Sequence, residues 1–183
     1  MIPRGTWWLI IVMILGIVRA TSGQGITLDP PAEGAFVLDA AEVISPEDEQ
    51  AIRDIAAAVL AETRTPIIVV TIDSMTNHWP GGPVMIETFA RILFDQWRIG
   101  HATIDGEVHN RGILVVVAVN DRKARIELGA GWGRGHDGAA ATIMNAILVP
   151  AFRAGTYGDG LLRAVAALGD LARGRPTGEP AVT

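Results

Sequence analysis

Two short runs of the chain are apolar on both faces, which is the pattern of strands buried inside a sheet. They are residues 66–73, PIIVVTID, and residues 112–119, GILVVVAV. Such strands must be covered on both sides, so helices are expected above and below the sheet. An amphipathic segment between the runs, residues 82–100, predicts a strand–helix–strand crossover. That connection is right-handed and makes the two strands parallel.

Amphipathic segments elsewhere predict further helices. Residues 45–63 begin with Ser45 as a cap and Pro46 at the first helical position, and their apolar residues repeat at helical spacing. Residues 137–152 and 157–172 predict two more helices near the end of the chain. Within residues 82–100, the stripe expected to be buried consists of Met85, Phe89, Ile92, Leu93 and Trp97.

A third strand is expected after the second buried run. The sequence NDRK at residues 120–123 predicts a hairpin turn, and in residues 124–130 polar and apolar side chains alternate. A strand with one polar face is typical of a sheet edge. Together these elements predict an α/β fold, a three-layer αβα sandwich around a small mixed, mainly parallel sheet.

The two ends of the chain are not expected to belong to this sandwich. Residues 1–24 carry a basic Arg4, an apolar run over residues 7–18 and small residues after it, which predicts a signal peptide and a secreted or periplasmic protein. An uncleaved N-terminal anchor is the alternative, and it would be the protein's only contact with the membrane. Proline-containing residues 25–35 predict a linker, and residues 173–183 a disordered tail.

Composition argues against nucleic-acid binding and excludes cysteine chemistry. The chain has 15 Lys and Arg against 20 Asp and Glu, a formal net charge of −5, and no basic stripe, so nucleic acid is not an expected partner. It has no cysteine, so thiol nucleophiles and thiolate metal sites are excluded. No nucleophile elbow, zinc helix or P-loop motif is present either. The residues therefore assign no catalytic group.

Several polar residues near predicted strand ends carry oxygen atoms suited to binding a metal ion. Asp39 follows three apolar residues, so its carboxylate is expected at the edge of the core, where it must find a partner or a cation. Asp73 and Ser74 close the first buried strand, the end at which open α/β sheets place ligands. Such oxygen atoms suit a hard cation such as Ca²⁺ or Mg²⁺. The histidines and acids of residues 101–112 have no ligand spacing, and this segment is expected to be a solvated polar connection.

Residues 129–138, GAGWGRGHDG, form a glycine-rich loop before a predicted helix. The pattern resembles a dinucleotide fingerprint, but the preceding strand belongs to a hairpin and does not open a strand–helix–strand unit. Exposed backbone amides make Gly133 and Gly135 candidates for holding an anion or a phosphate. In the alternative interpretation Asp137 caps the helix and the glycines only form the turn.

Four segments resemble those of TPM domains, in the family's order. They are FVLDAAEVISPEDEQAI at residues 36–52, FARILFDQWRIG at 89–100, RGILVVVAVNDRKARIELGAGWG at 111–133 and VPAFRAGTYGDGLLRAV at 149–165. The resemblance assigns residues 36–172 to one TPM domain. It implies an exported or membrane-tethered αβα domain. Plant relatives are linked to photosystem II repair, and some members are described as acid phosphatases and others as Ca²⁺-binding proteins.

The resemblance also implies which residues hold a metal. Asp39 matches the family's opening aspartate, and Asp137 matches an acid that begins the helix after the glycine loop. Where the family has Asp-Asn-Gly before its central strand, this chain has Asn110-Arg111-Gly112. Asn110 still offers a carbonyl oxygen, but it lacks the charge that tightens Ca²⁺ binding. Arg111 adds positive charge, which weakens the metal site and favours an anion.

Two functions follow as hypotheses. The first is an extracytoplasmic accessory or binding module that helps maintain membrane-protein complexes and carries a weak divalent-metal site, for Ca²⁺ or a similar cation, at the end of the sheet. The alternative is a metal-assisted hydrolase of phosphomonoesters. The missing nucleophile motif favours the first hypothesis.

Overall fold

The computed structural model describes residues 25–104 and 107–176 and contains the predicted mixed sheet. Its four strands are β1 (Val37–Asp39), β2 (Ile67–Ile72), β5 (Ile113–Ala118) and β6 (Lys123–Leu128), side by side in that order. β1, β2 and β5 are parallel, and β6 runs antiparallel to β5. The two buried runs are thus neighbouring strands, and β6 lies at one edge of the sheet, as predicted.

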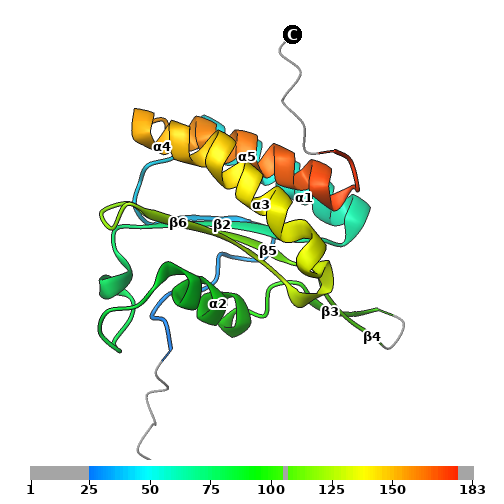
Figure 1. The fold of residues 1–183 in the computed structure, drawn as a ribbon, viewed down its shortest axis with the longest axis horizontal. Coiled ribbons are helices and arrows are strands. Elements are labelled where there is room, and N and C mark those ends of the chain that lie inside the picture. The colour runs from blue at the N-terminus through cyan, green and yellow to red at the C-terminus, as the bar shows by residue number, and fades with distance from the viewer. Residues whose placement is uncertain (1–24, 105–106, 177–183) are drawn as a thin grey trace, which may run out of the picture.

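Helices cover both faces of the sheet, which confirms the three-layer αβα sandwich (Figure 1). α2 (Ile86–Gln96) lies on one face. The other face carries α1 (Pro46–Thr63), α3 (Asp137–Ile143), α4 (Val149–Ala154) and α5 (Tyr157–Ala172). Because side chains alternate along a strand, Val69 of β2 packs toward α1 and α5, whereas the next residue, Val70, packs toward α2.

α1 begins as its sequence predicts. The Ser45 hydroxyl accepts a hydrogen bond from the Asp48 amide at 3.1 Å, and Pro46 occupies the first turn, where its missing N–H costs nothing. Ile52, Ala56 and Val59 are buried completely.

The stripe predicted for α2 is correct in its middle and wrong at its start. Phe89 and Leu93 are fully buried, but the side chain of Met85 is 66% exposed. The helix begins only at Ile86, so Met85 has an extended backbone and does not follow the helical spacing. Ile86, which is buried, takes the place expected for Met85.

Residues 101–112 contain a hairpin where a polar connection was expected. β3 (His101–Ile104) and β4 (Glu107–Asn110) pair as a separate two-stranded antiparallel sheet. The strand pattern is visible in retrospect, since polar and apolar residues alternate in 101–104, but the two strands are short. Between their ends lie residues 105–106, which are outside the described residues.

Residues 137–154 form one helical rod with an irregular middle. α3 continues into a π-helical turn, η4 (Met144–Leu148), and then into α4, which contains Pro150. Proline cannot donate an intrahelical hydrogen bond, so a regular α-helix is disfavoured in the turn before it. The described residues also contain three single 3₁₀ turns: η1 (Met75–Asn77), η2 (Ala130–Trp132) and η3 (Arg134–His136).

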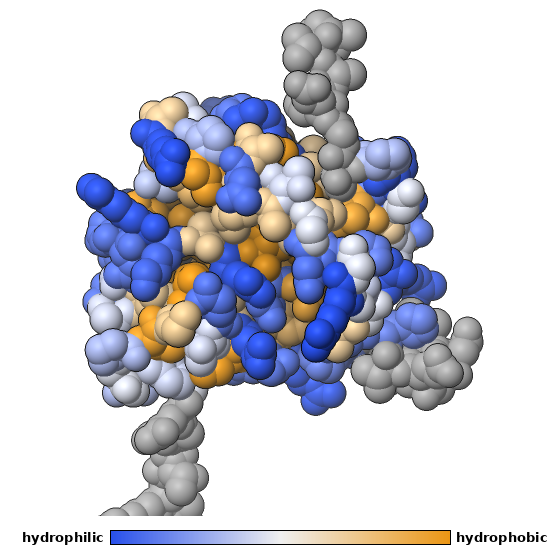
Figure 2. All heavy atoms as spheres, in the orientation of Figure 1, coloured by the Kyte–Doolittle hydropathy of each residue, from blue (hydrophilic) through white to orange (hydrophobic). Residues whose placement is uncertain are grey.

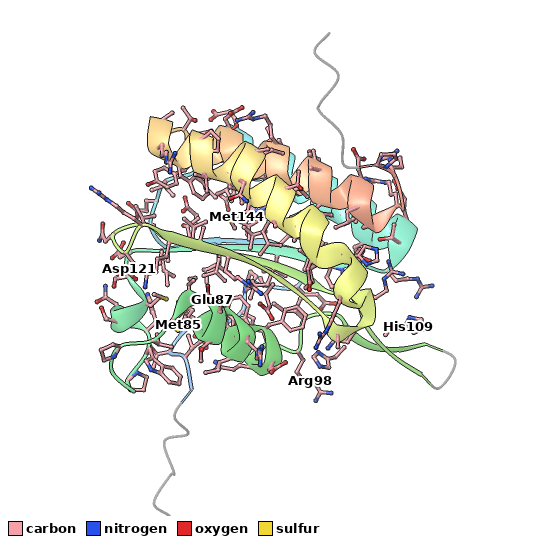
Figure 3. All side chains as sticks on the ribbon, viewed as in Figure 1. Met85, Glu87, Arg98, His109, Asp121 and Met144 are labelled. Carbon is pink, nitrogen blue, oxygen red and sulfur yellow. The ribbon has the colours of Figure 1, made fainter. Side chains whose placement is uncertain are left out.

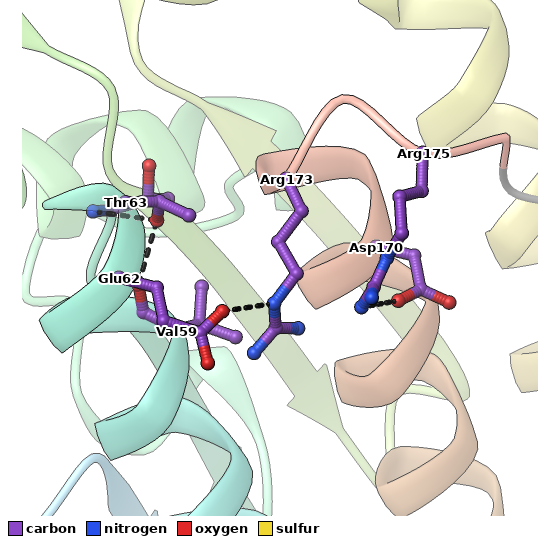
Figure 4. A network of polar contacts seen from close by, with 7 residues as sticks. Val59, Glu62, Thr63, Asp170, Arg173 and Arg175 are labelled. Carbon is purple, nitrogen blue, oxygen red and sulfur yellow. Dashed lines mark hydrogen bonds and ion pairs between the residues drawn. The ribbon is translucent and has the colours of Figure 1, made fainter.

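The residues that flank the sandwich make specific contacts. Ile26 is buried against α2, and its backbone N–H and C=O both bond to the Gln96 side chain, at 2.9 and 2.8 Å. After α5, Arg173 binds the Glu62 carboxylate of α1 and Arg175 binds Asp170 (Figure 4). The hydrogen bond from Arg173 holds the pKa of Glu62 below its ordinary value.

The predicted signal peptide, residues 1–24, and most of the predicted tail, residues 177–183, lie outside the described residues. Within residues 25–104 and 107–176, every helix is too short or too polar to cross a bilayer.

Candidate functional site

The parallel strands divide the polar residues between two edges of the sheet. The carboxyl edge is where β1, β2 and β5 end, and it carries Asp39, Asp73 and the β5–β6 turn with Asp121. The amino edge is where β5 begins and β6 ends, and it carries Asn110 and the glycine-rich loop. Figure 3 shows Asp121 and His109, one near each edge, at opposite ends of the sheet.

Asp39 is bound by the fold itself. Its carboxylate accepts hydrogen bonds from the backbone amides of Val43 and Ile44, at 3.2 and 2.8 Å, and from the hydroxyl of Thr71. Thr71 is fully buried on β2, beside Asp39 in the parallel register. The hydrogen-bond partners expected for Asp39 therefore come from the turn after β1 and from the neighbouring strand β2. Asp39 fixes where the chain leaves β1 for α1.

Asp121 has a similar role that the sequence did not reveal. Its carboxylate accepts hydrogen bonds from the Ser74 hydroxyl and the Met75 amide, both at 2.8 Å, and so ties the β5–β6 turn to the end of β2. Ser74 is thus engaged, and Asp73 beside it is exposed. At the carboxyl edge, two of these three carboxylates stabilise loops.

The amino edge contains a polar atom that the protein leaves without a partner. The side-chain oxygen of Asn110, Oδ1, is buried and accepts no hydrogen bond from any described residue. It lies so close to Gly129 that a Cβ on that glycine would approach it to 2.3 Å. A buried, unpaired oxygen costs stability, so Asn110 Oδ1 is a candidate contact for an ordered water or a ligand.

Beside Asn110, a cation is held over an aromatic ring. The guanidinium carbon of Arg111 lies 4.5 Å from the centroid of Trp132, whose indole N–H donates to the Arg111 carbonyl at 2.8 Å. His136 stands edge-on to the same indole, with centroids 5.1 Å apart, and its Nδ1 lies 2.6 Å from the Trp132 carbonyl oxygen. Sequence reasoning passed over Trp132, although an aromatic residue inside a glycine-rich loop is a signal of anchoring.

The two candidate glycines lie in the loop between Trp132 and α3. Gly133 has φ +63°, a backbone conformation that favours glycine, whereas Gly135 has ordinary backbone angles. No atom lies within 4 Å of a Cβ built on either residue. Asp137 is the exposed first residue of α3, and its side chain makes no capping hydrogen bond. The loop therefore turns through two 3₁₀ turns, without the cap proposed as the alternative for Asp137.

The three predicted metal ligands do not meet at one point. Asp39 pairs with Thr71, which pairs with Val117 near the end of β5, whereas Asn110 precedes that strand. At about 3.3 Å per residue the separation is roughly 20 Å. Because Ca²⁺ ligands lie within about 2.6 Å of the ion, Asp39 cannot share an ion with Asn110. Within residues 25–104 and 107–176, no three His, Asp or Glu side chains cluster as metal ligands.

Comparison with known proteins gives a family and a set of folds. The model of the TPM domain family matches residues 37–171. The N-terminal domain of a P. gingivalis protein, solved by solution NMR, is 28% identical with a TM-score of 0.63, over 78% of this chain and 85% of that one.

Two more solved structures share the fold. The N-terminal domain of cg2496 from Corynebacterium glutamicum is 18% identical, with a TM-score of 0.57 over 86% of this chain and 90% of its own. BA42 from the psychrophilic bacterium Bizionia argentinensis is 21% identical, with a TM-score of 0.57 over 75% and 88%. No curated protein matches the chain.

Proposed function

Because the chain belongs to the TPM domain family, we propose that it is an exported accessory module that binds membrane-protein complexes outside the cytoplasm. Export is supported by the signal-peptide pattern of residues 1–24. Binding, as opposed to hydrolysis, is supported by the use that the fold makes of Asp39. A carboxylate that accepts two backbone amides and a buried hydroxyl is a structural brace, with few lone pairs left for chemistry.

The surface we assign to the partner is the amino edge. Arg111 and His109 are exposed there, and Arg111 is held against Trp132. Arginine is enriched at the centres of protein interfaces, and a guanidinium fixed on a buried ring loses less conformational entropy when it binds. A positive group in that position favours acidic side chains on the partner.

Photo-cross-linking tests this role. A photoreactive residue in place of His109, at the amino edge, is expected to cross-link to membrane proteins in the cells that make the protein. The matched position is Asn77, which is also exposed, in η1 at the opposite edge, and is expected to give little product. Cross-linking from Asn77 alone, or from neither position, would rule out the amino edge as the partner surface.

We further propose that any divalent cation binds weakly, through Asn110 and Asp137 with water. Asn110 supplies an unpaired oxygen, and Asp137 supplies an exposed carboxylate at the start of α3. Two protein ligands fall short of the six to eight that Ca²⁺ takes, and Arg111 repels the ion. This arrangement supports neither tight binding nor metal-assisted catalysis.

Calcium titration by calorimetry or NMR tests the cation proposal. The expected dissociation constant is about 1 mM or weaker, which is the range of the weakest protein calcium sites. Asp137→Ala should abolish binding, and Asp39→Ala should leave the constant unchanged. Micromolar binding, or binding lost with Asp39, contradicts the proposal. Turnover of p-nitrophenyl phosphate that a chelator stops and Asp137→Ala removes would instead establish the hydrolase.

A further inference from the structure

A cavity of about 840 Å³ opens near the carboxyl edge, away from the amino edge assigned to the partner. It lies where the β5–β6 hairpin faces the helical rod of α3, η4 and α4, and Ile86, the first residue of α2, also lines it. Its volume is within the range of pockets that hold small molecules. Figure 2 shows apolar side chains along this side of the molecule, between the helical layer and the sheet.

One part of the cavity wall is apolar and aromatic. Met144 and Val149 come from the helical rod, and the rings of Phe152 and Tyr157 are stacked with centroids 4.9 Å apart and planes inclined by 23°. Met144 belongs to the π-helical turn, a feature that is rare in proteins and frequent at functional sites. This wall suits an aromatic or aliphatic ligand body, because such surfaces bind by burying apolar area.

The other part of the wall is cationic. Arg122 and Lys123 reach the cavity from the β5–β6 hairpin, and Arg153 reaches it from the end of α4. None of the three forms an ion pair with a described residue. Among the described residues that line the cavity there is no Asp or Glu, although the chain as a whole carries a net charge of −5. Three cations gathered without counter-charges create a positive local potential.

The neighbouring hollow along β6 has the opposite character. Its volume is about 440 Å³, and its lining includes Glu87, Glu127 and Asp137, while its one arginine, Arg125, is paired with Glu127 at 2.9 Å. The two hollows share Ala124 and Met144, so the groove beside the edge strand changes from basic to acidic along its length. An elongated anion would therefore be oriented, with its charged group at the hairpin end.

We propose that the larger cavity binds a small amphiphilic anion, which is a carboxylate or phosphate monoester attached to an aromatic or aliphatic body. The charged group contacts Arg122, Lys123 and Arg153, and the body lies against Met144 and the stacked rings. This site is separate from the amino edge and does not depend on the accessory role proposed there.

NMR titration with four probes tests the proposal: octanoate, octyl phosphate, inorganic phosphate and 1-octanol. At low salt, octanoate or octyl phosphate is expected to bind with a dissociation constant below about 1 mM and to shift the amides that line the cavity. Inorganic phosphate lacks the apolar body and 1-octanol lacks the charged group, so each should bind at least about tenfold more weakly. Comparison of the two amphiphiles shows whether the headgroup is a carboxylate or a phosphate.

Charge variants provide the control. Arg122 has φ +53°, so Arg122→Asn keeps a residue that tolerates this backbone, and it is combined with Arg153→Gln. The double variant should bind the best amphiphile roughly tenfold more weakly with an unchanged melting temperature, because both positions are exposed. The matched variant Arg91→Gln removes an exposed arginine of α2 outside the cavity and should bind normally. Equal binding of 1-octanol, equal affinity of the double variant, or shifts confined to other surfaces would overturn the proposal.

Discussion

Asp39 and Asn110 are both polar residues at the ends of strands, and their surroundings differ sharply. The Asp39 carboxylate accepts three hydrogen bonds from the protein, two of them from backbone amides. The buried oxygen of Asn110 accepts none from the described residues. Since a satisfied group stabilises the fold and an unsatisfied one costs stability, the first is explained by folding and the second is better explained by binding.

Replacing Asp39 should therefore reduce stability more than it affects ligand binding. Hydrogen bonds to a charged group are worth about 1.5–3 kcal/mol each when buried, and these are partly exposed, so Asp39→Ala should lower the free energy of unfolding by about 3 kcal/mol. Urea denaturation measures the change. Asp73→Ala, at the exposed end of the neighbouring strand, is the control and should stay within about 0.5 kcal/mol of wild type. Equal losses in the two variants would mean that Asp39 is not a brace.

At the scale of elements, what could be predicted depended on how far apart the interacting residues lie in the chain. The cap of α1 joins Ser45 to a residue three positions later, and the two buried strands are apolar except for Thr71, so both were predictable. The bond between Asp39 and Thr71 spans 32 residues, and the contact between Arg111 and Trp132 spans 21. Contacts of that kind depend on strand order and loop path, which local patterns do not determine.

The same reasoning applies to the metal site. A resemblance aligns residues along the chain, and it supplied Asp39, Asn110 and Asp137 as one ligand set. Only the parallel register shows that Asp39 ends its strand at the edge opposite to Asn110. The β3–β4 hairpin escaped prediction for a different reason, because two four-residue strands carry too few alternations to be distinguished from a polar connection.

Helix packing gives a prediction in which two glycine substitutions have opposite signs. A Cβ on Gly160 of α5 would lie 2.5 Å from the Cβ of Ala151, which belongs to α4 and cannot move without the helix. Gly160→Ala should therefore lower the free energy of unfolding by about 1–2 kcal/mol. Gly138 of α3 faces open space, so Gly138→Ala should raise it by about 0.5 kcal/mol through helix propensity. Thermal denaturation compares the two, and a stabilised Gly160→Ala would contradict the close approach of α4 and α5.

At the scale of the whole molecule, an ion pair as well as apolar contacts joins the helices on one face of the sheet. α1 and α5 pack side by side, and Arg173, just after α5, reaches across to Glu62 near the end of α1 (Figure 4). The pair lies at the surface, so water and salt weaken it. Because Arg173 lowers the pKa of Glu62 in the folded chain, the contribution of the pair depends on pH.

The lowered pKa of Glu62 determines how the stability of the fold changes with pH. Arg173 lowers the pKa of folded Glu62, so the pair stabilises the fold above the unfolded carboxyl pKa of about 4.3, and this contribution is lost as pH falls through the lowered folded value. Glu62→Gln should lower the melting temperature slightly at pH 7, and the deficit should shrink toward pH 2–3 and in about 1 M salt, where the Debye length is about 3 Å. Glu33→Gln, at an exposed loop residue, should show no such trend. A deficit that is constant from pH 7 to pH 2 would mean that Glu62 acts through packing and not through its charge.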